Sequence, residues 1–156
     1  MRRQQKGFSL IELLIVVAII LIIAAIAIPN LLRSKMVANE ASAVGSLRTI
    51  NTACIEYSTT YGGYPGALTN LGPATPATST SADLIDSVLA TGTKSGYTFA
   101  YAPGASDANG NVLAYAITAN PTNRGTTGQR GFFTNQTGVI RADATTAATA
   151  TSTPIS

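Results

Sequence analysis

The apolar side chains form one continuous block near the start of the chain, followed by two regions in which they recur periodically. The block runs from Leu13 to Ile28 and contains sixteen residues without a polar side chain. With the residues from Phe8 to Glu12 the segment is 21 residues long. An α-helix of that length spans about 31 Å, close to the hydrocarbon thickness of a bilayer. The block therefore predicts a helix that crosses a membrane or lies in a core built from many chains.

A helical period follows the apolar block. Between residues 44 and 61 the apolar side chains recur every three or four positions, so they lie on one face of a helix. They are Val44, Leu47, Ile50, Cys54, Tyr57 and Tyr61. The charged residues fall mostly off this stripe, on a predicted solvated face, and are Arg33, Lys35, Glu40, Arg48 and Glu56. We expect a kink or loosening at Pro29, which lacks an amide hydrogen, and a helix end at Gly62-Gly63 and Pro65.

Alternating positions then predict a small sheet. Before it, 65–81 is predicted to be a surface loop and 82–90 a short helix with Ser81 as its N-cap. Four antiparallel strands are enough to cover the helical stripe. The expected fold class is α+β, a long N-terminal α-helix packed on a small antiparallel β-sheet. The strands are expected at 97–101, 112–119, 132–134 and 139–141, the last two joined by a hairpin around Asn135-Gln136-Thr137-Gly138.

The net charge of the chain depends on its first residues. The formal value is +3, from ten basic and seven acidic residues, but Arg2, Arg3 and Lys6 all precede the apolar block. Without these three cations the basic and acidic residues balance at seven each. The charge therefore predicts no direct nucleic-acid partner. The three cations instead suit the cytoplasmic flank of a membrane helix.

One carboxylate, Glu12, lies inside the apolar segment. On insertion scales a charged side chain at the centre of a membrane helix costs about 2.5–3.5 kcal/mol, so Glu12 needs a partner. A plain single-pass anchor accounts for the length of the segment but not for this residue.

The residues around Glu12 carry a family resemblance. The run G-F-S-L-I-E-L-L-I-V-V-A-I-I, residues 7–20, resembles the class III signal of type IV pilins and pseudopilins. The match extends from Lys6 to Asn30 and includes Pro29. It is specific because it joins a basic leader, a Gly-aromatic cut site, a Glu at a fixed offset and a long apolar helix.

The resemblance implies a processing and assembly route. It implies cleavage between Gly7 and Phe8, N-methylation of Phe8, and assembly through Phe8, Glu12 and Pro29. In this route the Glu12 carboxylate meets the Phe8 ammonium of a neighbouring subunit. The implied partners are a prepilin peptidase and methyltransferase, an inner-membrane assembly platform, an assembly ATPase, membrane lipid and further copies in a helical homopolymer. The family often has Gly where this chain has Leu21, so the resemblance does not extend to helix unwinding before Pro29.

The implied layout is a leader at 1–7, an apolar helix at 8–29, a globular domain at 30–141 and a flexible tail, rich in Ala, Thr and Ser, at 142–156. The subunit would wait in the inner membrane with its N-terminus in the cytoplasm. It would then enter a surface pilus that serves adhesion, motility or DNA uptake. The alternatives are a type II secretion pseudopilin, a membrane-anchored binding module on a single-pass helix, and a secretory protein whose signal peptide is cut near Ala24–Ala27.

The sequence predicts no enzyme and no cofactor. It contains no His and one Cys, Cys54, so the commonest acid–base, nucleophile and zinc arrangements and any intramolecular disulfide are excluded. The best metal candidate is Asp107–Asn111, in which every second residue has a side-chain oxygen. An EF-hand loop would need Gly and Glu where Val112 and Thr118 stand. A strand connection with an Asn-Gly turn is the favoured interpretation of this loop, with calcium binding as its alternative.

The remaining candidates have simple structural interpretations. Asn135–Thr137 fits an N-glycosylation pattern and equally a hairpin turn. The Thr- and Ser-rich loop and tail could carry O-glycans or serve as surface padding. Cys54 is predicted to be a small buried hydrophobe. Helical and strand spacing places the tyrosines in the core rather than in a stacking or electron-transfer array, and these are Tyr57, Tyr61, Tyr64, Tyr97 and Tyr101.

Overall fold

The computed structural model describes residues 7–155, which form one long helix and a six-stranded sheet. The helix α1 spans Leu10–Tyr61, 52 residues. The chain divides into two compact units, residues 1–35 and 36–156, and α1 contributes its first part to one unit and its second part to the other. The α+β class expected from the sequence is confirmed.

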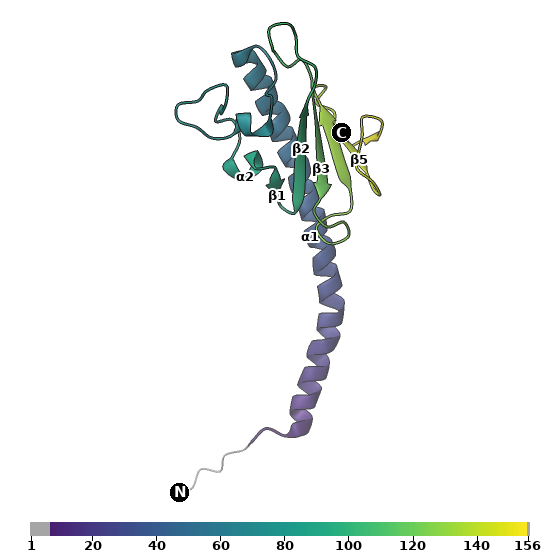
Figure 1. The fold of residues 1–156 in the computed structure, drawn as a ribbon. Helices are drawn as coiled ribbons and strands as arrows, with labels where there is room; N and C mark the ends of the chain where they lie inside the picture. The colour runs from purple at the N-terminus through teal and green to yellow at the C-terminus, as the bar shows by residue number, and fades with distance from the viewer. Residues whose placement is uncertain (1–6, 156) are drawn as a thin grey trace. The chain divides into compact units, whose positions relative to one another are not determined.

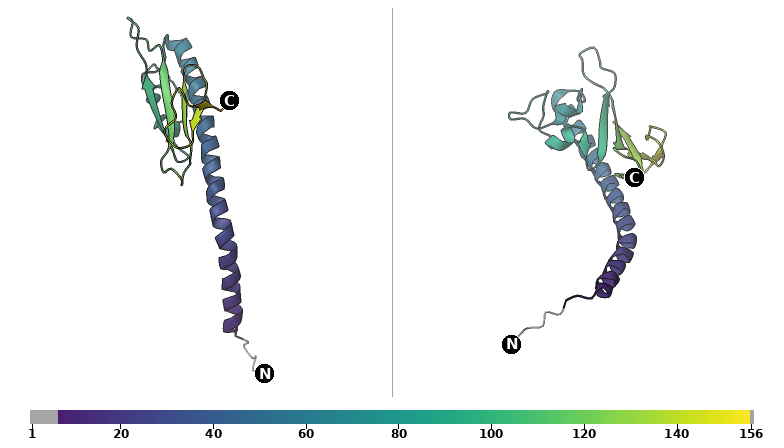
Figure 2. Two further views of the ribbon diagram at one scale, coloured as in Figure 1. Left: turned by 90° about the vertical axis from the view of Figure 1, so that its right-hand side faces the viewer. Right: turned by 60° about the horizontal axis from the view of Figure 1, so that its bottom comes forward.

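The sheet is antiparallel, and its strands follow one another in chain order from β1 to β6. Figure 1 shows the central strands beside the second part of α1, and the views of Figure 2 agree. Two short helices precede the sheet, η1 (Leu68–Leu71) and α2 (Ser87–Ala90). The strands are β1 (Thr93–Lys94), β2 (Tyr97–Pro103), β3 (Tyr115–Pro121), β4 (Gly131–Asn135), β5 (Arg141–Asp143) and β6 (Thr153–Pro154).

The apolar stripe of α1 forms the helical half of the core. Leu47, Ile50 and Cys54 are completely buried, and Val44 and Tyr61 at its ends are half-buried. The opposing side chains alternate along the strands, as the period of two predicted, and include Tyr97, Phe99, Tyr115, Ile117 and Phe132. Burial raises the pKa of the Cys54 thiol to about 12. Its prediction as a buried hydrophobe is therefore confirmed.

The helix ends where the glycines predicted its end. Tyr61 is the last residue of α1, and Gly62 follows with φ of +84°, a left-handed conformation that glycine adopts without steric cost. The segment after the helix is hydrogen-bonded to the loop before β3, because the Tyr64 N–H donates to the Val112 carbonyl at 2.9 Å.

The sheet has more strands than the sequence predicted. β2 and β4 lie where they were expected, but β3 begins at Tyr115 rather than at 112, and Leu113 is 59% exposed. β5 begins two residues later than predicted, and the hairpin with β4 is present. The edge strands β1 and β6 have two residues each, which is too short to show a period of two.

The predicted helix at 82–90 is wrong in its first half. α2 begins only at Ser87, and its N-cap is Asp86, which accepts the Leu89 N–H at 2.8 Å. Asp83 has φ of +56°, which interrupts a right-handed helix. The amides from 82 to 85 donate instead to carbonyls of residues 70–72, beside η1. A tertiary contact thus replaced the local helical preference.

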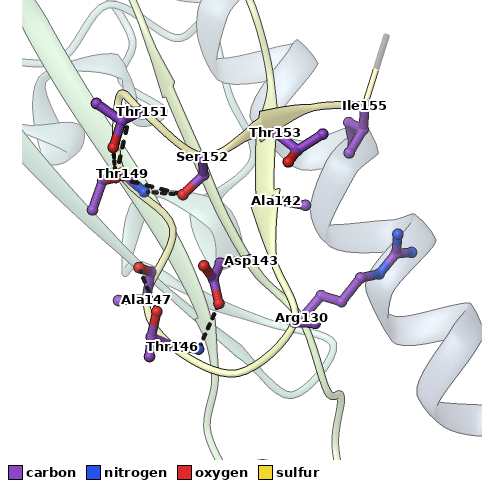
Figure 3. Close-up of a pocket in the computed structure, with 11 residues that line it drawn as sticks. Arg130, Ala142, Asp143, Thr146, Ala147, Thr149, Thr151, Ser152, Thr153 and Ile155 are labelled. Carbon is purple, nitrogen blue, oxygen red and sulfur yellow. Dashed lines mark hydrogen bonds between the residues drawn. The ribbon is translucent and has the colours of Figure 1, made fainter.

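The segment 142–156, predicted as a flexible tail, has regular structure and fixed contacts as far as it is described. It contains β6, and Ala148 is 2% exposed. Two guanidinium groups bind its backbone carbonyls: Arg124 binds those of Ala144 and Thr146 at 3.3 and 3.0 Å, and Arg141 binds that of Ser152 at 2.9 Å. The turns of this segment form the walls of an open hollow of about 620 Å³, and several Thr and Ser side chains line it (Figure 3). The composition of 142–156 suggested disorder because both arginines lie outside this segment.

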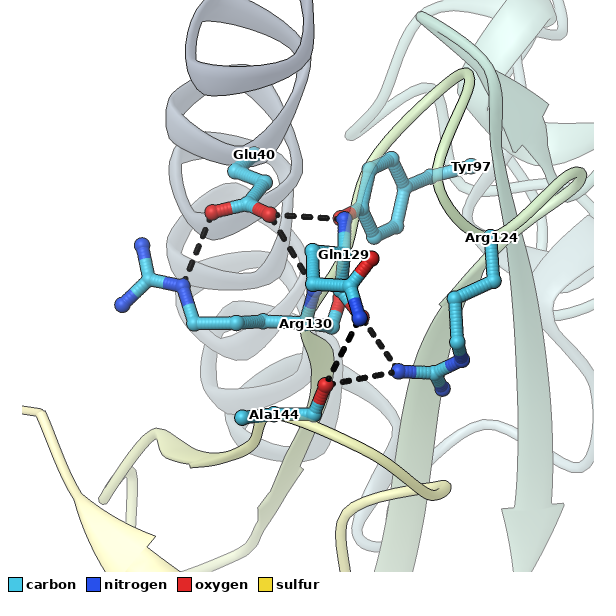
Figure 4. Close-up of polar contacts among 6 residues, drawn as sticks. All are labelled: Glu40, Tyr97, Arg124, Gln129, Arg130 and Ala144. Atoms are coloured by element: carbon cyan, nitrogen blue, oxygen red, sulfur yellow. Dashed lines mark hydrogen bonds and ion pairs between the residues drawn. The ribbon is translucent and has the colours of Figure 1, made fainter. Parts of the chain in front are cut away.

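Glu40 is the exception on the predicted solvated face of α1. It is 7% exposed, and its Oε1 accepts the backbone N–H groups of Gln129 and Arg130 at 2.8 and 3.1 Å (Figure 4). Its Oε2 pairs with the Arg130 Nε at 2.8 Å. Burial alone would raise the pKa of Glu40, but these donors outweigh burial and hold the pKa below its ordinary value. The other four charged residues of that set are exposed, as predicted.

A second buried polar group joins α1 to the sheet. Asn51 donates from Nδ2 to the Thr134 hydroxyl at 2.9 Å, and the Tyr115 hydroxyl donates to Asn51 Oδ1 at 3.1 Å. All three residues are buried. Sliding the helix by one turn would leave these groups without partners, and each such group costs about 1–3 kcal/mol. The network therefore defines the register of helix against sheet.

We expect Glu40→Gln to destabilise the folded domain by roughly 1–3 kcal/mol at neutral pH, because the amide cannot replace a carboxylate that accepts three hydrogen bonds. The pKa of Glu40 is lowered on folding, so its stabilisation is complete above its unfolded pKa and is lost as the pH falls through the folded value. Urea unfolding of wild type and variant at pH 7 and pH 3 measures this. A difference between the two proteins that is equal at both pH values would contradict the assignment.

We also expect residues 36–156, expressed without the preceding segment, to fold as a monomer. These residues form a compact unit whose helical stripe is already covered by the sheet. Circular dichroism and analytical sedimentation measure the outcome. An aggregated or molten fragment would mean that the sheet needs neighbouring subunits to fold.

Candidate assembly interface

The apolar part of α1 is uncovered by its own chain. The large apolar side chains from Phe8, just before the helix, to Leu32 have exposed fractions between 46% at Val17 and 90% at Phe8. Within the described residues α1 is the one helix long and apolar enough to cross a membrane, and none of its most apolar window is buried. Contiguous apolar surface of this size is covered by lipid or by other proteins. This surface is the candidate interface.

Glu12 lies at the first turn of the helix rather than along its apolar run. Its Oε2 accepts the backbone N–H of Ser9 at 2.8 Å, and Ser9 immediately precedes the first helical residue, Leu10. This is one of the two hydrogen bonds of a capping box, in which a Glu at the third helical position returns to the N-cap amide. This bond was not predicted, although the S-x-x-E spacing before an apolar run is its sequence signal.

The residues of the predicted cut site are accessible. Gly7 and Phe8 precede the helix and are exposed, and no side chain or distant backbone atom lies within 4 Å of the Cβ position of Gly7. Residues 1–6 of the predicted leader lie outside the described residues. Cleavage at Gly7–Phe8 and methylation of Phe8 stay predictions.

Pro29 lies within α1, which continues through it without a break. The proline supplies no amide hydrogen to the carbonyl of Ala25, one turn earlier, so one helical bond is missing there. Seventeen positions separate Pro29 from Glu12, about 26 Å along a helix. The structure therefore brings Glu12 to the Ser9 amide, beside the predicted cut site, and places Pro29 far from both.

The metal candidate is a turn stabilised by its own aspartate. Asp107 Oδ1 accepts the N–H groups of Asn109 and Asn111 at 2.8 and 2.9 Å, and Oδ2 accepts the Asn111 side chain at 3.1 Å. Gly110 has φ of +86°. No group of three or more His, Cys, Asp or Glu that could hold a metal occurs among the described residues. The geometry supports the turn interpretation.

The remaining candidates also have structural explanations. Asn135 Oδ1 accepts both the N–H and the hydroxyl of Thr137, at 3.1 and 2.6 Å, which closes the hairpin turn. The Tyr57 and Tyr61 ring centroids are 4.6 Å apart, and Tyr64 and Tyr101 both pack on Tyr115. Tyr97 is completely buried. Core packing is confirmed for this set.

Known proteins match parts of this sequence. A family model described as the prokaryotic N-terminal methylation motif matches residues 2–28. The type IV major fimbrial protein FimA of Dichelobacter nodosus is 40% identical over 121 residues, which are 73% of this chain and 72% of the relative. The type IV wide pilus major component PilA4 of Thermus thermophilus is 63% identical over 38 residues, 24% of this chain and 29% of the relative. The type II secretion system core protein G of Dickeya chrysanthemi is 31% identical over 81 residues, 49% and 53% of the two chains.

An uncovered apolar helix with an accessible Gly-Phe start, followed by a helix-on-sheet domain, defines a filament subunit of the prepilin type. The chain belongs to the family of type IV pilins and pseudopilins. Membership in this family implies a polymeric filament and processing at the methylation motif.

Proposed function

We propose that this chain is the structural subunit of a type IV pilus. It is inserted in the inner membrane with its N-terminus in the cytoplasm, cut between Gly7 and Phe8, methylated on the Phe8 amine, and polymerised through α1. The observation that carries this proposal is the uncovered apolar surface of α1. The domain at 36–156, which includes the second part of α1, has its own core, so only the first part of the helix is assigned this role.

The apolar surface alone does not drive assembly. Lipid tails and neighbouring apolar helices both remove this surface from water, so moving the helix between the two environments gains little from the hydrophobic effect. A polar interaction that is available only in the filament is needed to favour assembly. Glu12 supplies it, because it is the ionisable side chain of the apolar segment.

The partner of Glu12 is the Phe8 ammonium that cleavage creates. The Ser9 bond occupies one oxygen of Glu12 but leaves its negative charge uncompensated, and Oε1 remains as an acceptor. An ammonium from a neighbouring subunit compensates both charges. Two charges that are each costly in a medium of low dielectric constant offset one another when they are adjacent.

The subunit performs no chemistry of its own in this proposal. A prepilin peptidase and methyltransferase cut and methylate it, and an assembly platform and ATPase move it from the membrane into a surface filament. Adhesion, motility or DNA uptake would be properties of that filament. A pseudopilin of type II secretion is the second candidate, favoured by the similarity to the core protein G. The longer and closer match to FimA favours the pilus.

Processing is the first test of this function. Because Gly7-Phe8 is exposed at the border of leader and apolar helix, we expect the mature protein to begin at Phe8 and to carry a methyl group on its amine. Intact-mass measurement of membrane and fibre material checks this. A mature N-terminus near Ala25 or Ala27 would support a secretory signal peptide, and an uncut chain would support a membrane-anchored binding module. Electron microscopy of cells with and without the chain separates a pilus from a short periplasmic pseudopilus.

The second test replaces Glu12. Glu12→Ala should leave insertion and cleavage intact and should favour residence in lipid, by up to roughly 2.5–3.5 kcal/mol and by less near the interface. The yield of sheared fibres should nevertheless fall severely, because the Phe8 ammonium loses its partner. Glu12→Gln is the matched control: its amide oxygen can still accept the Ser9 N–H but carries no charge. A yield near wild type for Gln alone would assign Glu12 to helix capping, and normal yield for both variants would defeat the mechanism.

A further inference from the structure

The second part of α1 has an uncovered face opposite its buried stripe. Between residues 36 and 61 the exposed positions fall within an arc of roughly 140° around the helix axis. We call this surface the open helix face, defined by Ala41, Gly45, Arg48, Thr52, Ile55 and Glu56. Ile55 is an apolar side chain that is 55% exposed there. No described element of the domain covers this face.

The open helix face carries two opposite charges that do not meet within one chain. Arg48 and Glu56 are eight positions apart, about 12 Å along the helix, which is twice the spacing at which side chains on one helix pair. The ion pairs among the described residues are Lys94–Asp86 and Arg130–Glu40, and neither includes Arg48 or Glu56. Each chain therefore presents an exposed cation and an exposed anion along one helix.

Gly45 lies on the same face, three residues before Arg48. It is in the interior of α1, where glycine costs roughly 0.5–1 kcal/mol relative to alanine. A Cβ at this position would meet nothing within 4 Å apart from the adjacent helix backbone. The missing side chain thus leaves room at the surface for another backbone to approach.

We propose that the open helix face is a contact between copies of this chain in the filament, in which Arg48 of one copy pairs with Glu56 of another. The proposal rests on the proposed function, because it needs a polymer of parallel subunits. Charge complementarity identifies the occupant: a parallel copy displaced by about 12 Å along the helix brings the two charges level.

Charge reversal in the full-length chain tests the pairing. Arg48→Glu and Glu56→Arg each place like charges together and should lower the yield of sheared fibres by about tenfold or more, whereas the double reversal restores opposite charges and should recover most of the yield. The double variant Ala77→Glu/Gln136→Glu, at two exposed loop positions, is the control with the same change of net charge as Arg48→Glu. Intact mass and the amount of membrane protein show that each variant is made and processed. Single reversals with normal yield, or a double variant as poor as the singles, would overturn the proposal.

Cross-linking tests the contact directly. In the double variant Arg48→Cys/Glu56→Cys the two thiols of one chain are about 12 Å apart, too far for an internal disulfide, which needs Cα atoms within about 7 Å. Oxidised fibres should therefore give a ladder of multimers under denaturing, non-reducing conditions. The native Cys54 is completely buried and adds no background. Fibres of the double variant that give no ladder, either on oxidation or with a bifunctional thiol reagent shorter than the 12 Å or so between the two thiols of one chain, would overturn the contact. Wild-type cells without fibres would instead refute the proposed function.

Discussion

The apolar surface of α1 is the constraint on which the rest of this protein depends. Its large side chains are exposed along the whole segment from Phe8 to Leu32, and water is a poor environment for so large an apolar surface. Lipid and a bundle of identical helices cover it equally well, so the same segment suits both the membrane and a filament. The difference in free energy between the helix in lipid and the helix in a filament then depends on polar groups. Glu12 is the ionisable one within the apolar segment, and its capping bond to Ser9 leaves its charge to be compensated elsewhere.

The second part of the same helix differs from the first, because it packs in one specific register against a sheet of its own chain. Apolar contacts at Leu47 and Ile50 supply burial but little directional information. The polar contacts of Asn51 with Thr134 and Tyr115, and of Glu40 with the two residues before β4, supply that direction. These contacts disfavour any shift of the helix along the sheet, since a displaced helix would leave buried donors and acceptors unpaired.

The end of the chain is held without a disulfide, which a chain with one Cys cannot form internally. Arg124 and Arg141 hold the last segment through its backbone carbonyls instead. Every residue has a backbone carbonyl, so the residue types in this segment, mostly Ala, Thr and Ser, do not indicate which carbonyls bind the arginines. The same limitation explains the missed strand β6, whose two residues pair with β5 through backbone groups.

Features that depend on near neighbours along the chain were determined by the sequence alone. The apolar segment, the stripe through Leu47, the helix end at Gly62 and the strand from Tyr97 each follow from residues within one turn or one strand. The burial of Glu40 was decided only by the tertiary structure, because its donors lie 89 and 90 positions away. The burial of an apolar side chain can be predicted from its residue type. A polar side chain is buried or exposed according to whether the fold places a hydrogen-bond or charge partner beside it.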